Sequence, residues 1–164
     1  MPTPLNFAHR FDATPERVFA LFTDPGFLEG RLADTGGLDP QVVGVDTADG
    51  VTTVVTRQSI PSSALPSMVA SMINGDPVTE RTETWRADGE GRTADFSVVI
   101  KGAPASLKGT MKLTAADGGT DWVVDANATV PIPLFGGKIE SIITEQVGTL
   151  LTGEAAYTAT TLAS

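Results

Sequence analysis

The chain of 164 residues contains no cysteine and a single histidine, His9. Without cysteine there is no disulfide framework, no thiol nucleophile and no cysteine-ligated metal site. One histidine excludes a multi-histidine metal centre and leaves only one imidazole for a catalytic triad. The Gly36-Gly37 and Gly136-Gly137 pairs lack the spacing of a phosphate-binding loop. We therefore expect neither a metal site nor a cofactor.

Positive charge is also scarce, with 11 Lys and Arg residues against 20 Asp and Glu residues and a formal net charge of -9. Nucleic acids and anionic membrane surfaces are bound through clustered positive charge, and no such cluster is present, so neither partner is expected. No apolar run approaches the ~20 residues of a membrane span. The first seven residues lack the basic and apolar regions of a signal peptide. These absences predict a cytoplasmic protein without stable membrane insertion.

Hydrophobic residues make up 41% of the chain, and no internal repeat is found, which predicts one domain over residues 1–164. Its longest predicted element is a helix from Gly137 to about Thr161, because no proline follows Pro133. The apolar residues of this segment form one helical stripe. They are Ile139, Ile143, Val147, Leu150, Leu151 and Tyr157.

Glu140 and Glu154 project into the same apolar stripe of the predicted helix. An unpaired carboxylate is costly to bury, so its presence there needs an explanation. Either both side chains reach water along their stems near the helix ends, or the helix faces a cavity instead of a solid core.

The N-terminal part of the chain predicts a strand followed by two short helices. Residues 5–11 alternate between apolar and polar, and His9 falls on the apolar face. Thr14 is a plausible helix N-cap, and Pro15 suits the first helical position. A second short helix is predicted to follow Pro25 and to end before Gly36.

The middle of the chain predicts six antiparallel strands with tight turns. These strands cover residues 41–46, 51–57, 78–86, 93–101, 106–114 and 120–130. Because Gly109, Ala126 and Ala128 are small, we expect space in the interior if they face inward. Strands that run together and helices that are segregated from them predict an α+β fold. In this fold a curved sheet of six or seven strands wraps around the C-terminal helix.

The segment between the second and third of these strands is short, apolar and rich in methionine. Its apolar residues recur at helical spacing and are Leu65, Met68, Val69, Met72 and Ile73. Methionine is unbranched and adapts to variable apolar partners, which predicts a lid. The other interpretation is an edge of the core.

Two segments and the order of elements resemble the START-like superfamily, also called the SRPBCC, helix-grip or polyketide-cyclase/birch-pollen-allergen-like fold. The segments are FDATPERVFALFTDP at residues 11–25 and VPIPLFGGKIE at residues 130–140. The resemblance covers essentially the whole chain, and the second segment is similar to an uncharacterised bacterial branch. It implies a deep, mostly apolar cavity between sheet and long helix, used by relatives for lipids, sterols, polyketides or plant hormones. Some relatives are cyclases, aromatases or dehydratases, so fold alone does not choose a function.

We therefore expect the protein to bind or carry a hydrophobic small molecule in that cavity. The candidate apolar lining is Trp85, Phe96, Val98, Met111, Ile139, Ile143, Val147 and Leu150. The candidate polar groups are His9, Arg81, Glu83 and Glu154. The alternative placement for Arg81, Glu83 and Trp85 is the outer face of the sheet, where the two charges would form a cross-strand ladder.

Two other functions remain open from the sequence. An acid–base enzyme of cyclase or dehydratase type could use His9 with Glu154, or Arg81 with Glu83, in the same cavity. A protein-interaction module could instead dock a partner on the surface of residues 68–73.

Overall fold

The computed structural model describes residues 2–65, 67–71, 73 and 75–164, without the side chains of residues 64, 68 and 69. The strands are β1 (Thr3–Phe11), β2 (Leu38–Ala48), β3 (Val51–Ser59), β4 (Val78–Asp88), β5 (Gly91–Ile100), β6 (Ser106–Ala116) and β7 (Gly119–Thr129). The helices are α1 (Pro15–Phe22), α2 (Pro25–Thr35), the 3-10 helix η1 (Ser62–Ala64), α3 (Ser67–Ala70) and α4 (Gly136–Ala163). This order confirms the predicted α+β fold.

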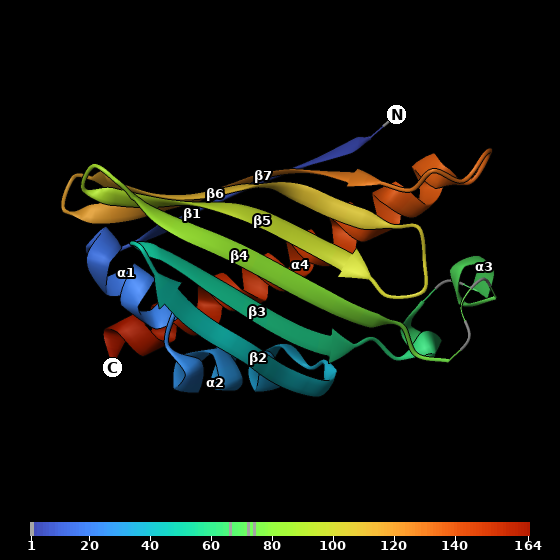
Figure 1. Cartoon of the computed structure of the whole chain (residues 1–164), viewed down its shortest axis with the longest axis horizontal. Coiled ribbons are helices and arrows are strands. Elements are labelled where there is room, and N and C mark those ends of the chain that lie inside the picture. Colours follow the sequence, from blue (N-terminus) through green and yellow to red (C-terminus); the bar gives the residue numbers. More distant parts are fainter. Residues whose placement is uncertain (1, 66, 72, 74) are drawn as a thin grey trace.

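The strands form one seven-stranded antiparallel sheet in the order β1-β7-β6-β5-β4-β3-β2. Figure 1 shows α4 crossing behind the sheet, with α1 and α2 near its C-terminal end and α3 at the opposite end of the molecule. The chain thus passes from one edge strand, β1, to the other, β2, through α1 and α2. This is the predicted wrapping of a sheet around the long helix.

Local sequence explains where the first two helices begin. The Thr14 hydroxyl accepts a hydrogen bond from the Arg17 backbone N–H at 3.3 Å and caps α1. The Asp24 carboxylate accepts one from the Phe27 N–H at 2.8 Å and caps α2. In each helix a proline follows the cap, where its missing N–H removes no helical bond.

Three hairpins turn within two residues, so their strands are longer than the sequence predicts. The strand register runs up to the pairs Ala48–Val51, Asp88–Gly91 and Ala116–Gly119. Asp49 and Asp117 have φ of 52° and 47° and are each followed by a glycine with positive φ. Two consecutive positive φ values are typical of the tight turns whose twist matches that of paired strands.

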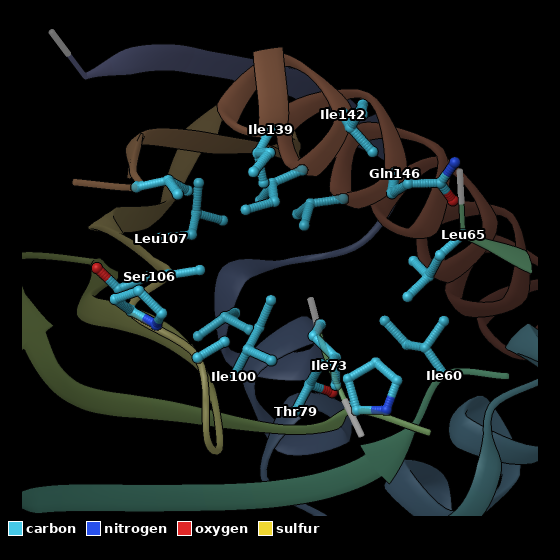
Figure 2. Close-up of a pocket in the computed structure, with 18 of the residues that line it drawn as sticks. Ile60, Leu65, Ile73, Thr79, Ile100, Ser106, Leu107, Ile139, Ile142 and Gln146 are labelled. Carbon is cyan, nitrogen blue, oxygen red and sulfur yellow. The ribbon is translucent and has the colours of Figure 1, made fainter. Parts of the chain in front are cut away.

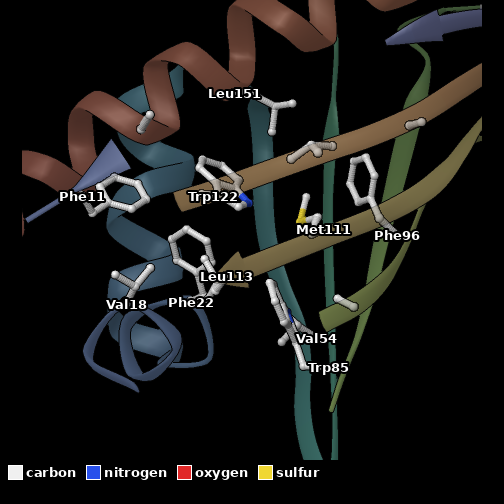
Figure 3. Packing of buried hydrophobic residues seen from close by; sticks show 14 of the residues in the cluster. Phe11, Val18, Phe22, Val54, Trp85, Phe96, Met111, Leu113, Trp122 and Leu151 are labelled. Carbon is white, nitrogen blue, oxygen red and sulfur yellow. The ribbon is translucent and has the colours of Figure 1, made fainter. Parts of the chain in front are cut away.

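The closely packed core lies at the α1 end of the sheet. Trp85 and Trp122 are both fully buried there. Figure 3 shows Phe22 reaching from α1 towards these two rings. Its ring centroid is 5.0 Å from that of Trp122 and 6.2 Å from that of Trp85. Aromatic side chains therefore fill the space between sheet and helices at this end.

Helix α4 does not lie equally close to all strands. It packs most closely against β1 and β7, and against α2 near its own C-terminal end. A Cβ at Gly148 or Gly153 would make only ordinary contacts, with Leu5 at 3.7 Å and Thr35 at 3.6 Å, whereas a Cβ at Gly30 of α2 would clash with the Tyr157 hydroxyl of α4. A helix that is drawn towards one side of a curved sheet stands further from the strands on the other side, β3 to β5.

The small residue Gly109 does not create interior space. A Cβ at this position would clash with the Asp125 carbonyl and the Ala126 backbone of β7. The expectation that it leaves room in the interior is therefore wrong. Because Gly109 has no side chain, the backbone of β7 lies in the space that a Cβ would occupy.

Substituting Gly109 by alanine tests this account. Gly109→Ala forces β6 and β7 apart, and we expect it to lower the free energy of unfolding by about 2 kcal/mol, as overpacking does. Gly137→Ala is the matched control, since nothing lies within 4 Å of a Cβ there. It should leave stability unchanged or raise it by up to ~1 kcal/mol through helix propensity. Urea unfolding measures both, and equal effects would contradict the close approach.

Candidate ligand-binding site

An apolar cavity of about 150 Å³ lies between α4 and the sheet at the α3 end. Helix α4 contributes Ile139, Ile142 and Ile143 to its wall. Ile100 and Leu107 face them from β5 and β6, and Figure 2 shows these side chains converging on one space. The wall is closed by residues of the β3–β4 connection, among them Leu65 and Ile73. We call this space the apolar cavity.

A larger cavity of about 540 Å³ adjoins the apolar one and extends towards α2. The two share the wall residues Ile60, Thr79, Val98, Gln146 and Val147. The larger cavity adds residues of β3 and α2 and a group of buried charged side chains. Together the two cavities occupy the side on which α4 stands away from β3 to β5.

Four charged side chains and one tryptophan form what we call the charge cluster. Its members are Arg31, Arg81, Glu83, Glu154 and Trp85. The Arg81 Nε donates to Glu83 Oε2 at 2.6 Å, and its Nη1 donates to Glu154 Oε2 at 2.7 Å. The Trp85 Nε1 donates to Glu83 Oε1 at 2.9 Å. Arg31 Nη1 lies 3.6 Å from Glu154 Oε1. Arg31, Arg81 and Glu154 also line the larger cavity.

Three elements bring the charge cluster together. Arg81, Glu83 and Trp85 alternate along β4, so all three point to its inner face. Glu154 comes from the inner face of α4, and Arg31 from the inner face of α2. The alternative placement of the β4 residues on the outer face is therefore wrong. Their exposed fractions are only 9%, 1% and 0%.

Electrostatic pairing keeps the cluster ionised despite its burial. Burial would raise the pKa of Glu154, but the charges of Arg31 and Arg81 outweigh it and hold this pKa below its usual value of 4.5. Burial opposes the charged form of Arg81 too, yet Glu154 and Glu83 raise its pKa overall. For Arg31, burial prevails over the attraction of Glu154 and lowers its pKa below the usual value.

Not every polar atom of the cluster is satisfied. Among the described residues, Arg31 Nε and Nη1, Arg81 Nη2 and Glu154 Oε1 are buried without a hydrogen-bond partner. The guanidinium of Arg81 lies over the Phe96 ring at 5.2 Å, and that of Arg31 over the Phe22 ring at 5.7 Å. These ring contacts stabilise the cations but do not replace hydrogen bonds.

Ten of the residues that the sequence singled out lie in a cavity wall. They are Leu65, Ile73, Arg81, Phe96, Val98, Ile139, Ile143, Val147, Leu150 and Glu154. Met72 lies outside the described residues, as do the side chains of Met68 and Val69.

Four candidates lie elsewhere: His9, Glu83, Trp85 and Met111 line neither cavity. Glu83 belongs to the charge cluster, behind the wall that Arg81 forms. Trp85 and Met111 are fully buried in the closely packed core, because α1 covers that end of the sheet. His9 lies against Phe11, with ring centroids 4.8 Å apart, and no contact recorded for the described residues joins it to Glu154.

Arg31 is the member of the charge cluster that the sequence did not single out, and wall residues such as Ile100, Leu107 and Ile142 were also not among the candidates. Arg31 follows Phe27 by four residues and Leu28 by three, so it falls on the buried face of its short helix, where it is 1% exposed. A cation on an apolar helical stripe is the signal that predicts a buried counter-charge. Two glutamates on the apolar stripe of the C-terminal helix give the complementary signal.

The interpretation that Glu140 and Glu154 reach water is wrong, since each is only 3% exposed. Glu140 accepts hydrogen bonds from the Thr3 hydroxyl and the Val130 backbone N–H, both at 2.9 Å. The bond from Val130, helped by that from Thr3, outweighs desolvation and lowers the pKa of Glu140. Glu140 thus attaches the first turn of α4 to the ends of β1 and β7, whereas Glu154 lines the larger cavity.

Within the described part of the chain, no three histidine, aspartate or glutamate side chains gather as they would around a metal ion. Each described helix also falls short of the length or apolarity that crossing a bilayer requires.

Comparison with known proteins gives both a family and a fold. Residues 6–162 match the family described as "Protein of unknown function (DUF2505)". The uncharacterized protein Rv0481c of Mycobacterium tuberculosis is 33% identical over 166 residues, covering 96% of this chain and 95% of that protein.

Two solved structures share the fold. TTHA0849 from Thermus thermophilus has a TM-score of 0.65 at 19% identity, covering 97% of this chain and 99% of that one. The Zhui aromatase/cyclase from Streptomyces has a TM-score of 0.63 at 10% identity, with 97% and 92% covered. The resemblance to the START-like superfamily is confirmed at the level of the fold.

The charged residues of the cluster should depend on one another, so that removing one of them lowers the free energy of unfolding strongly. Arg81→Met leaves Glu83 and Glu154 buried without their main partner, and we expect the free energy of unfolding to fall by about 3–5 kcal/mol. Arg57→Met is the matched control on the neighbouring strand. It breaks the more exposed pair with Glu80, whose atoms are 2.6 Å apart, and should lower stability by at most ~1 kcal/mol. Urea unfolding that shows equal losses would contradict a coupled buried cluster.

Acid should destabilise the protein through Glu140. Its folded pKa lies below the usual 4.5, so the unfolded chain binds the proton more readily. The stabilisation is complete above the unfolded pKa and is lost as pH falls through the folded one. The stability of the wild type minus that of Glu140→Gln should therefore shrink as pH decreases below about 4.5. Urea unfolding between roughly pH 3 and 6 measures this difference, and a constant difference would contradict the assignment.

Proposed function

This chain belongs to the DUF2505 family and has the helix-grip fold, and from that premise we propose that it binds a hydrophobic small molecule between β3–β5 and α4. The observation that carries the proposal is the apolar cavity. Its wall is built almost entirely from aliphatic side chains of α4, β5, β6 and the β3–β4 connection. Ligand sites in proteins are concave and mostly apolar, with a few polar groups that orient the ligand.

The contrast within the fold supports binding. At the α1 end, tryptophan and phenylalanine rings fill the space between sheet and helices. At the α3 end the same sheet and helix present branched aliphatic side chains around open space. Protein interiors are otherwise packed as densely as organic crystals, so an apolar space gives up dispersion contacts. A hydrophobic guest would make those contacts.

The charge cluster supports binding over acid–base catalysis. A general acid or base works best when its pKa lies near the working pH. Glu154 instead has a pKa below 4.5, and its arginine partners are permanent cations at neutral pH. His9 lines neither cavity and has no recorded contact with Glu154. The Zhui aromatase/cyclase shares the fold at 10% identity, which carries no catalytic residue over to this chain.

Two adjacent valines of β5 provide the test. Val98 lines both cavities, whereas Val99 is 37% exposed on the opposite face of the sheet. The wild type should bind the neutral dye N-phenyl-1-naphthylamine saturably and one-to-one, as fluorescence titration measures. Val98→Trp places a large side chain where the two cavities adjoin and should weaken binding about tenfold or more, which corresponds to about 1.4 kcal/mol.

Val99→Trp adds the same side chain on the outer face and should leave dye binding unchanged. Absence of saturable binding to the wild type, or equal weakening by both variants, would overturn the proposed function.

A further inference from the structure

We propose that the ligand carries an uncharged hydroxyl group, which the charge cluster binds while the apolar body of the ligand extends into the apolar cavity. This inference rests on the proposed function and adds the chemistry of the head group. It is carried by three properties of the cluster: its atoms without a hydrogen bond, its balanced charge and its position along the cavities.

The cluster atoms without a hydrogen bond include both donors and an acceptor. Arg81 Nη2 and Arg31 Nε and Nη1 are donors without a hydrogen bond, and Glu154 Oε1 is an acceptor without one. Arg31 Nη1 and Glu154 Oε1 form an ion pair at 3.6 Å, a distance too long for a hydrogen bond. Buried polar groups are nearly always hydrogen-bonded, so such a group of unsatisfied atoms in one place points to a missing partner. All three side chains are about nine-tenths or more buried, and all three line the larger cavity.

A hydroxyl group fits this set. It can accept from an arginine N–H and donate its own hydrogen to Glu154 Oε1 at the same time. A ketone or ester oxygen can only accept, and would leave the glutamate oxygen unsatisfied. These cluster atoms lie just behind the cavity wall, so the head group would reach them after a small guanidinium rotation or through one bridging water.

The balance of charge argues against an ionised head group. Two arginines and two glutamates give the cluster a formal charge of zero, and their pKa values keep Arg81 and Glu154 ionised. A ligand carboxylate would place an extra negative charge beside the buried carboxylate of Glu154. Burying such an uncompensated charge is strongly unfavourable. An ammonium group would meet the same penalty beside the arginines.

The position of the cluster sets which part of a ligand meets it. The two cavities adjoin at shared wall residues, including Val98 and Val147, and the charged side chains line only the larger one. Beside the cluster, Phe96 and Leu150 continue the apolar wall. An elongated ligand therefore finds polar partners at one end and apolar surface along the rest.

Competition against the bound dye tests the head group directly. Decan-1-ol, decanoate and decane share one chain length and differ at one end. At pH 7.5 we expect decan-1-ol to displace N-phenyl-1-naphthylamine from the wild type at concentrations about tenfold lower than decanoate or decane require.

Removing the negative charge of Glu154 should reverse the preference for decan-1-ol over decanoate. Glu154→Gln gives the cluster a net positive charge, so decanoate should become the better competitor. Glu80→Gln makes the same change in a partly exposed glutamate paired with Arg57, and should keep the wild-type preference.

If Glu154→Gln does not fold, the pH dependence of dye displacement from the wild type tests the charge of the head group instead. Lowering the pH from 8 to 5 increases the neutral fraction of decanoic acid, whose carboxyl resembles a glutamate with a pKa of ~4.3. Displacement by the acid should then improve, while displacement by decan-1-ol stays constant.

The outcomes separate the two proposals. A wild type that does not bind the dye overturns the proposed function itself. Dye binding with decanoate or decane equal to decan-1-ol leaves that function standing and overturns the hydroxyl assignment. An unchanged preference in folded Glu154→Gln, or a pH-independent displacement by decanoic acid, also overturns it.

Discussion

The ion pair between Arg81 of β4 and Glu154 of α4 joins sheet and helix on the side where they stand apart. Their atoms are 2.7 Å apart, and both side chains are buried. Neither charge tolerates this position without the other, because an unpaired ion in the interior is costly. The pair therefore constrains α4 to remain over β4 at a distance that two long side chains can span. The larger cavity lies beside that contact.

A second glutamate fixes the other end of the same helix. Glu140 receives the Val130 N–H and the Thr3 hydroxyl, which attaches the helix start to the ends of β7 and β1. Fourteen residues separate Glu140 from Glu154, or roughly 21 Å along a helix. Between these anchors the apolar residues that line the cavities are Ile142, Ile143, Val147 and Leu150, and Gln146, Thr149 and Gly153 line them as well. The helix is thus attached by polar contacts at two points and presents apolar side chains between them.

The polar contacts also separate what supports the fold from what lines its cavities. The aromatic core at the α1 end and the two glutamate anchors hold sheet and helix in place. Side chains such as Val98 of β5 and Val147 of α4 instead form the cavity walls. Membership in the DUF2505 family and the fold shared with TTHA0849 accordingly define the architecture, and the residues of the cavity wall define what it can hold.

Periodicity and caps were sufficient to predict the elements and their order. Thr14 with Pro15, the glycine turns and the proline-free C-terminal segment act over a few residues, so their effects can be read locally. They gave the start of α1, the hairpins and a helix that the structure extends by one residue at its N-terminal end and two at its C-terminal end. Apolar wall residues such as Val98 and Ile143 followed from the same periodicity.

Distances between elements could not be read in this way. Sequence periodicity states which residues of a strand share a face, but it left open whether Trp85 faces inward. In the structure both Trp85 and Val98 face inward, and of these two only Val98 lines a cavity. The difference arises because α1 covers one end of the sheet and α4 leans towards β1 and β7. The meeting of Arg31, Arg81 and Glu154 likewise depends on three elements that are distant in sequence. The amino-acid pattern by itself therefore determined the α+β order and which residues of an element share a face. Tertiary packing decided where those faces close on a solid core and where they enclose charged and apolar space.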